Sequence, residues 1–182
     1  DPLQQEEEEE GSAHTQQRFK GLLCGEAELQ EALGKANNSK LGGNDAFALG
    51  NYAQAEQNYS NAIGSLEAVV EISALLQTLR APGGQVASTM VQLGKEVVVS
   101  LASFYANRAT CYGKLQEWVK AHRDGSQTVL LRPNWWKGYS INAALYAKQQ
   151  LFEQAAAQYM LCLERCNDTL TNVEREKIQP RL

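Results

Sequence analysis

This 182-residue chain is poor in histidine, the side chain that most often carries out acid–base catalysis. Histidine, whose charge changes near neutral pH, occurs only as His14 and His122. The sequence contains no glycine-rich phosphate loop, no histidine pair spaced as in a metalloprotease helix and no Ser-His-Asp candidate. We therefore expect a protein that is not an enzyme and that acts by binding.

The cysteines are the other candidates for chemistry. Cys162 and Cys166 are one helical turn apart and would be able to share a metal ion, but a zinc site normally has four ligands. Together with Cys24 and Cys111, they fit no disulfide framework. We expect reduced thiols, as in a cytoplasmic protein, and neither a metal nor another cofactor.

A repeat of 34 residues provides the elements that would position a binding site. Residues 36–69, 102–135 and 136–169 place small and aromatic residues at the same offsets, among them Gly43, Asn44, Phe47, Tyr52, Ala55, Tyr59, Ala62, Ala109, Tyr112, Trp118, Ala121, Pro133, Ala143, Phe152, Ala155 and Tyr159. The period resembles that of the tetratricopeptide repeat (TPR), a helix-turn-helix unit that buries its apolar face only when copies stack. The resemblance implies an all-α fold with three helical hairpins in a right-handed superhelix.

An insertion, residues 70–101, separates the first two repeats. The apolar face of the second helix continues through Leu79, and the segment from Arg80 to Gln85 then breaks it with a proline and two glycines. The next helix is predicted over residues 86–115. The insertion should therefore lengthen two neighbouring helices into an extended first hairpin.

The two ends of the chain differ in composition. Six of the 21 acidic residues lie in the first ten positions, and we expect residues 1–25 to form a disordered acidic tail ahead of a TPR domain over residues 26–182. Residues 170–182 should form a capping helix whose outer face is exposed to solvent. Pro133 should lie in the first turn of an earlier helix. Trp135 and Trp136 are interpreted as core residues, although they could also stack on a ligand.

Charge and hydropathy narrow the range of partners. After the first ten residues, the chain has 17 basic and 15 acidic residues. This balance is not the basic surface typical of nucleic-acid binding. No apolar run approaches the roughly 20 residues that span a membrane, and the acidic start is unlike a signal peptide. We expect a monomer that binds neither nucleic acid nor membrane.

Short motifs within the repeats resemble one subgroup of TPR domains. Repeat one contains Lys40-Leu-Gly-Gly-Asn44, repeat two contains Asn107-Arg-Ala after an aromatic residue, and repeat three contains Lys137-Gly-Tyr-Ser-Ile141. This sequence is similar to the co-chaperone type, in which a carboxylate clamp holds the C-terminal Glu-Glu-Val-Asp tail of the 90-kDa and 70-kDa heat-shock chaperones. The resemblance implies that Lys40, Asn44 and Asn107 hold the terminal carboxylate of that peptide.

The same resemblance implies that Lys137 binds the side-chain carboxylate of the last aspartate of the peptide. The chain departs from the pattern at Ile141, where the family has an arginine that contacts this carboxylate. Lys40 and Asn44, four residues apart, share one helix face, and charge-assisted hydrogen bonds from such groups are roughly twice as strong as neutral ones.

The function implied is that of a co-chaperone docking domain whose partner is the C-terminal peptide of a heat-shock chaperone. Two alternatives remain open. One is a scaffold that binds a different peptide or a helix through the extended hairpin of residues 66–101. The other is the docking part of a larger enzyme such as an immunophilin.

Overall fold

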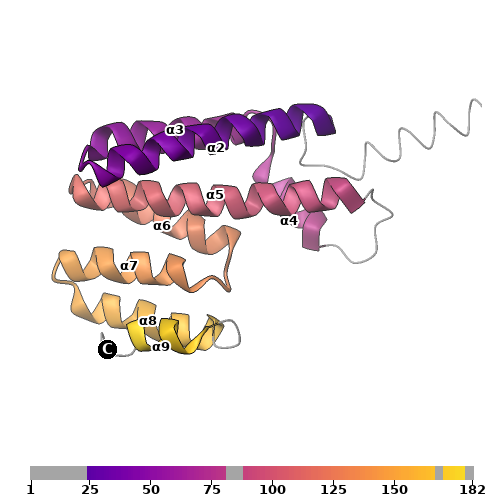
Figure 1. The fold of residues 1–182 in the computed structure, drawn as a ribbon. Coiled ribbons are helices and arrows are strands. Elements are labelled where there is room, and N and C mark those ends of the chain that lie inside the picture. Colours follow the sequence, from indigo (N-terminus) through magenta and orange to yellow (C-terminus); the bar gives the residue numbers. More distant parts are fainter. Residues whose placement is uncertain (1–23, 81–87, 167–169, 179–182) are drawn as a thin grey trace, which may run out of the picture.

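Helices form nearly all of the described chain. The computed structural model describes residues 24–80, 88–166 and 170–178, and Figure 1 shows the helices in order along this part of the chain. They are α2 (Glu26–Ala48), α3 (Tyr52–Glu67), α4 (Ile72–Arg80), α5 (Ser88–Lys114), α6 (Trp118–Leu131), α7 (Trp136–Lys148), α8 (Phe152–Cys166) and α9 (Asn172–Ile178). None of them is long and apolar enough to cross a membrane.

The helices pack as stacked hairpins, which confirms the predicted all-α superhelical fold. Helix α2 packs on α3, the second half of α5 packs on α6, and α7 packs on α8. Contacts of α3 with α5, and of α6 with α7, join each hairpin to the next (Figure 1). Helix α9 then lies at the C-terminal end of the stack as the expected cap.

The turn inside each hairpin has the same backbone geometry. Gly50, Gln116 and Gln150 occupy equivalent positions, and their φ angles are +76°, 62° and 62°. This left-handed conformation suits glycine because other residues bring Cβ too close to the carbonyl oxygen. In the first hairpin, the side chain of Asn51 then caps α3 by accepting a hydrogen bond from the Gln54 N–H at 3.3 Å.

The aromatic positions of the repeat are largely core positions. Tyr59, Tyr112 and Tyr159 are buried, whereas Tyr52 is half-buried and stacks edge-on against Phe47. Trp135 and Trp136 pack against the two largest core clusters, in agreement with their interpretation as core residues. Pro133 lies in the connection before α7 and not in its first turn, because a turn from Arg132 to Trp135 joins α6 to α7.

The insertion differs from the prediction in one helix. Residues 88–114 form the expected long helix, but the expectation that the preceding helix continues through Leu79 is wrong. Helix α3 ends at Glu67, and α4 starts anew after Glu71, whose carboxylate accepts hydrogen bonds from the N–H groups of Ser73 and Ala74. Val70 is buried within the intervening segment, so core packing and this cap both favour the break. The predicted breaker beyond Arg80 lies outside the described residues.

The first and last described helices define the two ends of the stack. Helix α2 begins at Glu26, whereas the acidic run Glu6 to Glu10 lies outside the described residues. In the cap, Leu170 is buried against the third hairpin and Thr171 and Glu174 form reciprocal hydrogen bonds at the start of α9.

Candidate functional site

Three residues predicted to bind a peptide line one hollow. The side chains of Asn44, Asn107 and Lys137 come from α2, α5 and α7, and the hollow that they share has a volume of about 340 Å³. We call it the inner hollow; its other lining residues are Phe47, Ala48, Tyr59 and Thr110. Because these three residues belong to three different repeats, only the stacking of the repeats places them around one hollow.

Tyr59 orients the amide of Asn44. Its hydroxyl donates a hydrogen bond to Asn44 Oδ1 at 2.8 Å, so the amide nitrogen of Asn44 is left to donate elsewhere. Burial raises the pKa of Tyr59 to about 12, with a smaller contribution from Cys111, and a hydrogen bond with Asn107 opposes the shift. The phenol therefore remains a neutral donor at physiological pH.

Gly43 makes room for this tyrosine. A Cβ atom at position 43 would lie only 2.7 Å from a ring carbon of Tyr59, a distance that real Cβ atoms essentially never show. The glycine of the repeat motif therefore lets α2 approach α3 closely enough for the contact between Asn44 and Tyr59.

The other two predicted residues lie outside the lining of the inner hollow. Lys40 is half-buried on α2, one turn before Asn44. Ile141 is half-buried and, like Trp118, packs against a cluster formed by Tyr112, Ala121 and Leu145. Lys137 itself is exposed, with its Nζ 5.7 Å from the centre of the Trp135 ring, and none of the ion pairs among the described residues involves Lys40 or Lys137.

The groups considered for chemistry are arranged as packing residues. Cys162 and Cys166 are buried, and burial raises the pKa of Cys162 to about 12. Within the described ranges, no cluster of three or more His, Cys, Asp or Glu side chains is placed to hold a metal ion. His122 lies against the ring of Tyr146, 4.3 Å between centroids, and burial lowers its pKa.

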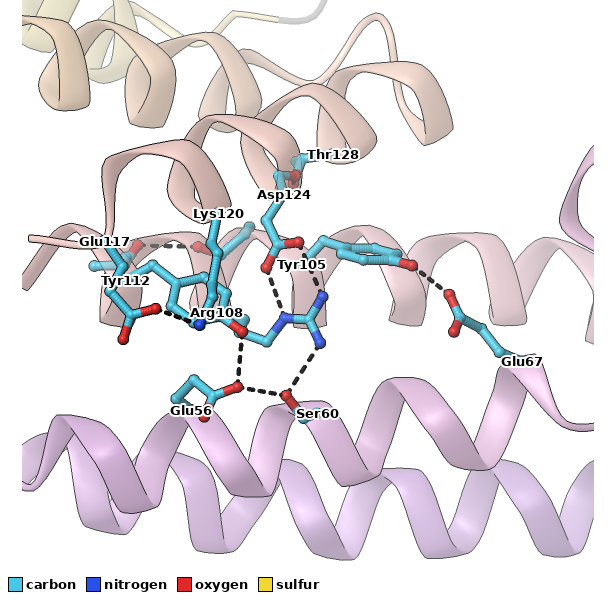
Figure 2. Close-up of polar contacts among 12 residues, drawn as sticks. Glu56, Ser60, Glu67, Tyr105, Arg108, Tyr112, Glu117, Lys120, Asp124 and Thr128 are labelled. Carbon is cyan, nitrogen blue, oxygen red and sulfur yellow. Dashed lines mark hydrogen bonds and ion pairs between the residues drawn. The ribbon is translucent and has the colours of Figure 1, made fainter. Parts of the chain in front are cut away.

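A partly buried polar network, which sequence reasoning missed, lies on another side of α5 (Figure 2). The Arg108 guanidinium donates to both carboxylate oxygens of Asp124, at 2.6 Å and 2.9 Å, and also to Ser60 Oγ at 3.0 Å. Glu56 accepts hydrogen bonds from Ser60 and Tyr112, and Glu67 accepts one from Tyr105. These bonds connect α3, α5 and α6.

At the centre of this network, Asp124 shifts the pKa of Arg108. Burial by itself lowers the pKa of Arg108, but the hydrogen bonds and charge of Asp124 raise it overall. The guanidinium therefore stays charged, as its bidentate contact requires. The sequence contained part of the signal for this pair. Adjacent residues of a helix point in different directions, so Asn107 and Arg108 should serve different surroundings. The partner Asp124 is not predictable from spacing alone.

Known structures share this fold. The first TPR of Spaghetti (RPAP3) bound to an HSP90 peptide superposes with a TM-score of 0.53 at 19% identity, covering 82% of this chain and 91% of that chain. The Sgt2 TPR domain from Aspergillus fumigatus gives 0.54 at 16% identity, with 80% and 76% covered. The second TPR domain of human RPAP3 in complex with an HSP70 peptide gives 0.50 at 18% identity, with 83% and 98% covered.

These similarities place the chain in the TPR fold. No protein-family model matches its sequence. At identities below one fifth, the likeness concerns the backbone arrangement, and the peptides named above belong to those other proteins.

Proposed function

We propose that this protein is a co-chaperone docking module that binds the acidic C-terminal tail of a heat-shock chaperone in the inner hollow. The observation that carries the proposal is the meeting of Asn44, Asn107 and Lys137 at one hollow, supplied by three successive repeats. Two of the similar structures are complexes with HSP90 or HSP70 peptides, which supports a peptide of this class as the ligand.

The chemistry of the hollow suits a chain terminus. A terminal carboxylate accepts several hydrogen bonds at once, and amide and ammonium donors held by rigid helices lose little entropy when they bind it. Asn44 and Asn107 would hold the terminal carboxylate, Lys137 the side chain of the last aspartate, and Lys40 would add positive charge from one turn away. Such a role requires no catalytic group and is carried out in the cytoplasm by a monomer.

A titration with two peptides tests this function. The free-acid and C-amidated forms of Met-Glu-Glu-Val-Asp differ only at the terminal carboxylate. We expect saturable binding of the free acid, weaker binding at high salt because exposed charges are screened over about 10 Å, and loss of binding in Lys137→Glu.

The matched control is Lys95→Glu, an exposed lysine of α5 outside the hollow, which should bind like the unmodified protein. Equal binding of the amidated peptide would exclude recognition of a terminal carboxylate.

A further inference from the structure

We propose that a second groove, formed by the inserted helix α4, binds an acidic amphipathic segment of a partner protein. This α4 groove has a volume of about 1190 Å³ and is lined by residues of α3, α4, α5 and α6. Sites for small molecules are typically roughly 300–1,000 Å³. The larger volume and the position between helices fit a helical peptide segment.

The α4 groove and the inner hollow use different faces of α5. Tyr105, Arg108 and Tyr112 line the α4 groove, whereas Asn107 and Thr110 line the inner hollow. With 3.6 residues per turn, the mean directions of these two sets are roughly half a turn apart. A ligand in one site therefore leaves the other accessible.

One part of the α4 groove is apolar. Helix α4 contributes Ile72 and Leu76, and α6 contributes Leu130, whose side chain is 53% exposed. Ile63 of α3 also belongs to the lining but is already buried in the core, so the exposed apolar surface comes from the other three residues. Apolar side chains gathered around a groove are a surface that gains free energy when a partner covers it.

Basic side chains outnumber acidic ones in the lining of the α4 groove: Arg80, Arg108, Lys120 and Arg123 against Glu67, Glu71 and Asp124. Its carboxylates already accept hydrogen bonds: Glu67 from Tyr105, Glu71 from the backbone of α4, and Asp124 from Arg108. In contrast, neither Arg80 nor Arg123 belongs to any ion pair among the described residues. A partner that brings carboxylates beside its apolar residues would pair with these arginines, and this complementarity selects an acidic occupant.

The polar network beside the α4 groove holds the groove in shape before a partner segment binds. Arg108 lies at the centre of Figure 2, with Asp124 on one side and Ser60 and Glu56 on the other. Because these contacts join α3, α5 and α6, the walls are already held at their spacing, and binding requires little ordering of the protein.

Three synthetic peptides of about four helical turns, all C-amidated so that they lack a terminal carboxylate, test the proposal on the full chain. The first has a leucine face flanked by glutamates, the second has the same composition with the face scrambled, and the third has lysine in place of every glutamate. We expect the first to bind at least about ten-fold more tightly than the other two, and less tightly at high salt.

Two test variants and three control variants locate the binding site. Leu130→Glu should weaken binding of the first peptide by about ten-fold, whereas Val119→Glu, on the same helix, 86% exposed and outside the groove, should not. Arg123→Glu should weaken binding by about five-fold, and Lys95→Glu should not. Lys137→Glu should also leave binding unchanged, which separates this site from the inner hollow.

Four results would overturn the proposal: equal affinity for the three peptides, no saturable binding up to about 1 mM, equal effects of the paired variants, or loss of binding in Lys137→Glu. Substituting glutamine for Glu6 to Glu10 in the full chain tests a different occupant. If that change strengthens peptide binding by about ten-fold or more, the chain's own acidic run competes for the groove, and a partner segment is not its occupant.

Discussion

Asn107 and Arg108 are neighbours in the sequence but belong to different sites. The amide of Asn107 lines the inner hollow, and the guanidinium of Arg108 pairs with Asp124 beside the α4 groove. A rotation of about 100° per residue on an α-helix separates the two side chains. One short motif thus supplies a candidate ligand-binding group and an internal structural contact.

The pair of Arg108 and Asp124 should contribute strongly to stability. The carboxylate is 3% exposed and the arginine side chain 18% exposed, so Asp124→Ala would leave a largely buried cation without its partner. We expect a loss of about 3 kcal/mol in the free energy of unfolding, measured by urea denaturation. As a control, Glu117→Ala removes the exposed partner of Lys120 and should cost less than about 1 kcal/mol. Similar losses in both variants would show that the buried ion pair contributes no more to the free energy of unfolding than the exposed one.

Ile141 tests the peptide assignment at a single position. We expect Ile141→Arg to increase affinity for a Glu-Glu-Val-Asp peptide by about five-fold, because a charge-assisted hydrogen bond would be added next to Lys137. Since Ile141 is half-buried, the long arginine side chain can lie along the Tyr112 cluster, and stability should fall by no more than about 1 kcal/mol. Calorimetric titration and thermal melts measure the two effects. A large loss of stability with no gain in affinity would assign Ile141 to packing alone.

At the scale of elements, the hairpin turns set how each pair of helices folds back. All three use a residue with positive φ, but only the first has glycine there. The two glutamines therefore hold a backbone conformation that costs L-residues roughly 1–2 kcal/mol. The repeat tolerates this cost because packing of the two helices determines the turn.

Gln150→Gly should relieve the strain in the third hairpin. We expect a gain of about 0.5–1 kcal/mol in unfolding free energy, since the greater freedom of glycine in the unfolded chain offsets part of the relief. The control is Gln154→Gly, an exposed residue within α8, which should lose about 0.5–1 kcal/mol. Urea denaturation of both variants measures the difference. Destabilisation by both would indicate that the turn is not strained.

At the scale of the whole molecule, the stack of hairpins carries the stability. We expect deletion of residues 1–20 to change the unfolding free energy by less than about 0.5 kcal/mol, because the segment has no apolar periodicity. Deletion of residues 170–182 should instead lower the melting temperature, because Leu170 is buried and Trp136 donates to Glu174 at 2.5 Å. A clear fall in melting temperature after the first deletion would show that the tail docks on the helical body.

The repeat period made most of the fold predictable. The 34-residue spacing indicated the hairpins and the buried tyrosines, and the apolar pattern after the breaker at Arg80 to Gln85 indicated the long helix α5. Asn44, Asn107 and Lys137 were candidates for one site because the short motifs around them resemble those of the co-chaperone type of TPR domain. The break at residues 68–71 was not predictable, because the apolar periodicity runs through it and the competing cap by Glu71 is a local hydrogen-bond choice.

The sequence by itself determined the local preferences: which segments are helical, where small residues recur and which donors each repeat carries. Only the tertiary structure decided which of these donors meet. Lys40 and Ile141 share the motif with the three residues of the inner hollow but do not line it. The position of α4, and with it the α4 groove, also depends on packing between distant segments. Spacing along the chain specifies the face of a helix, whereas the separation of two faces depends on every side chain packed between them.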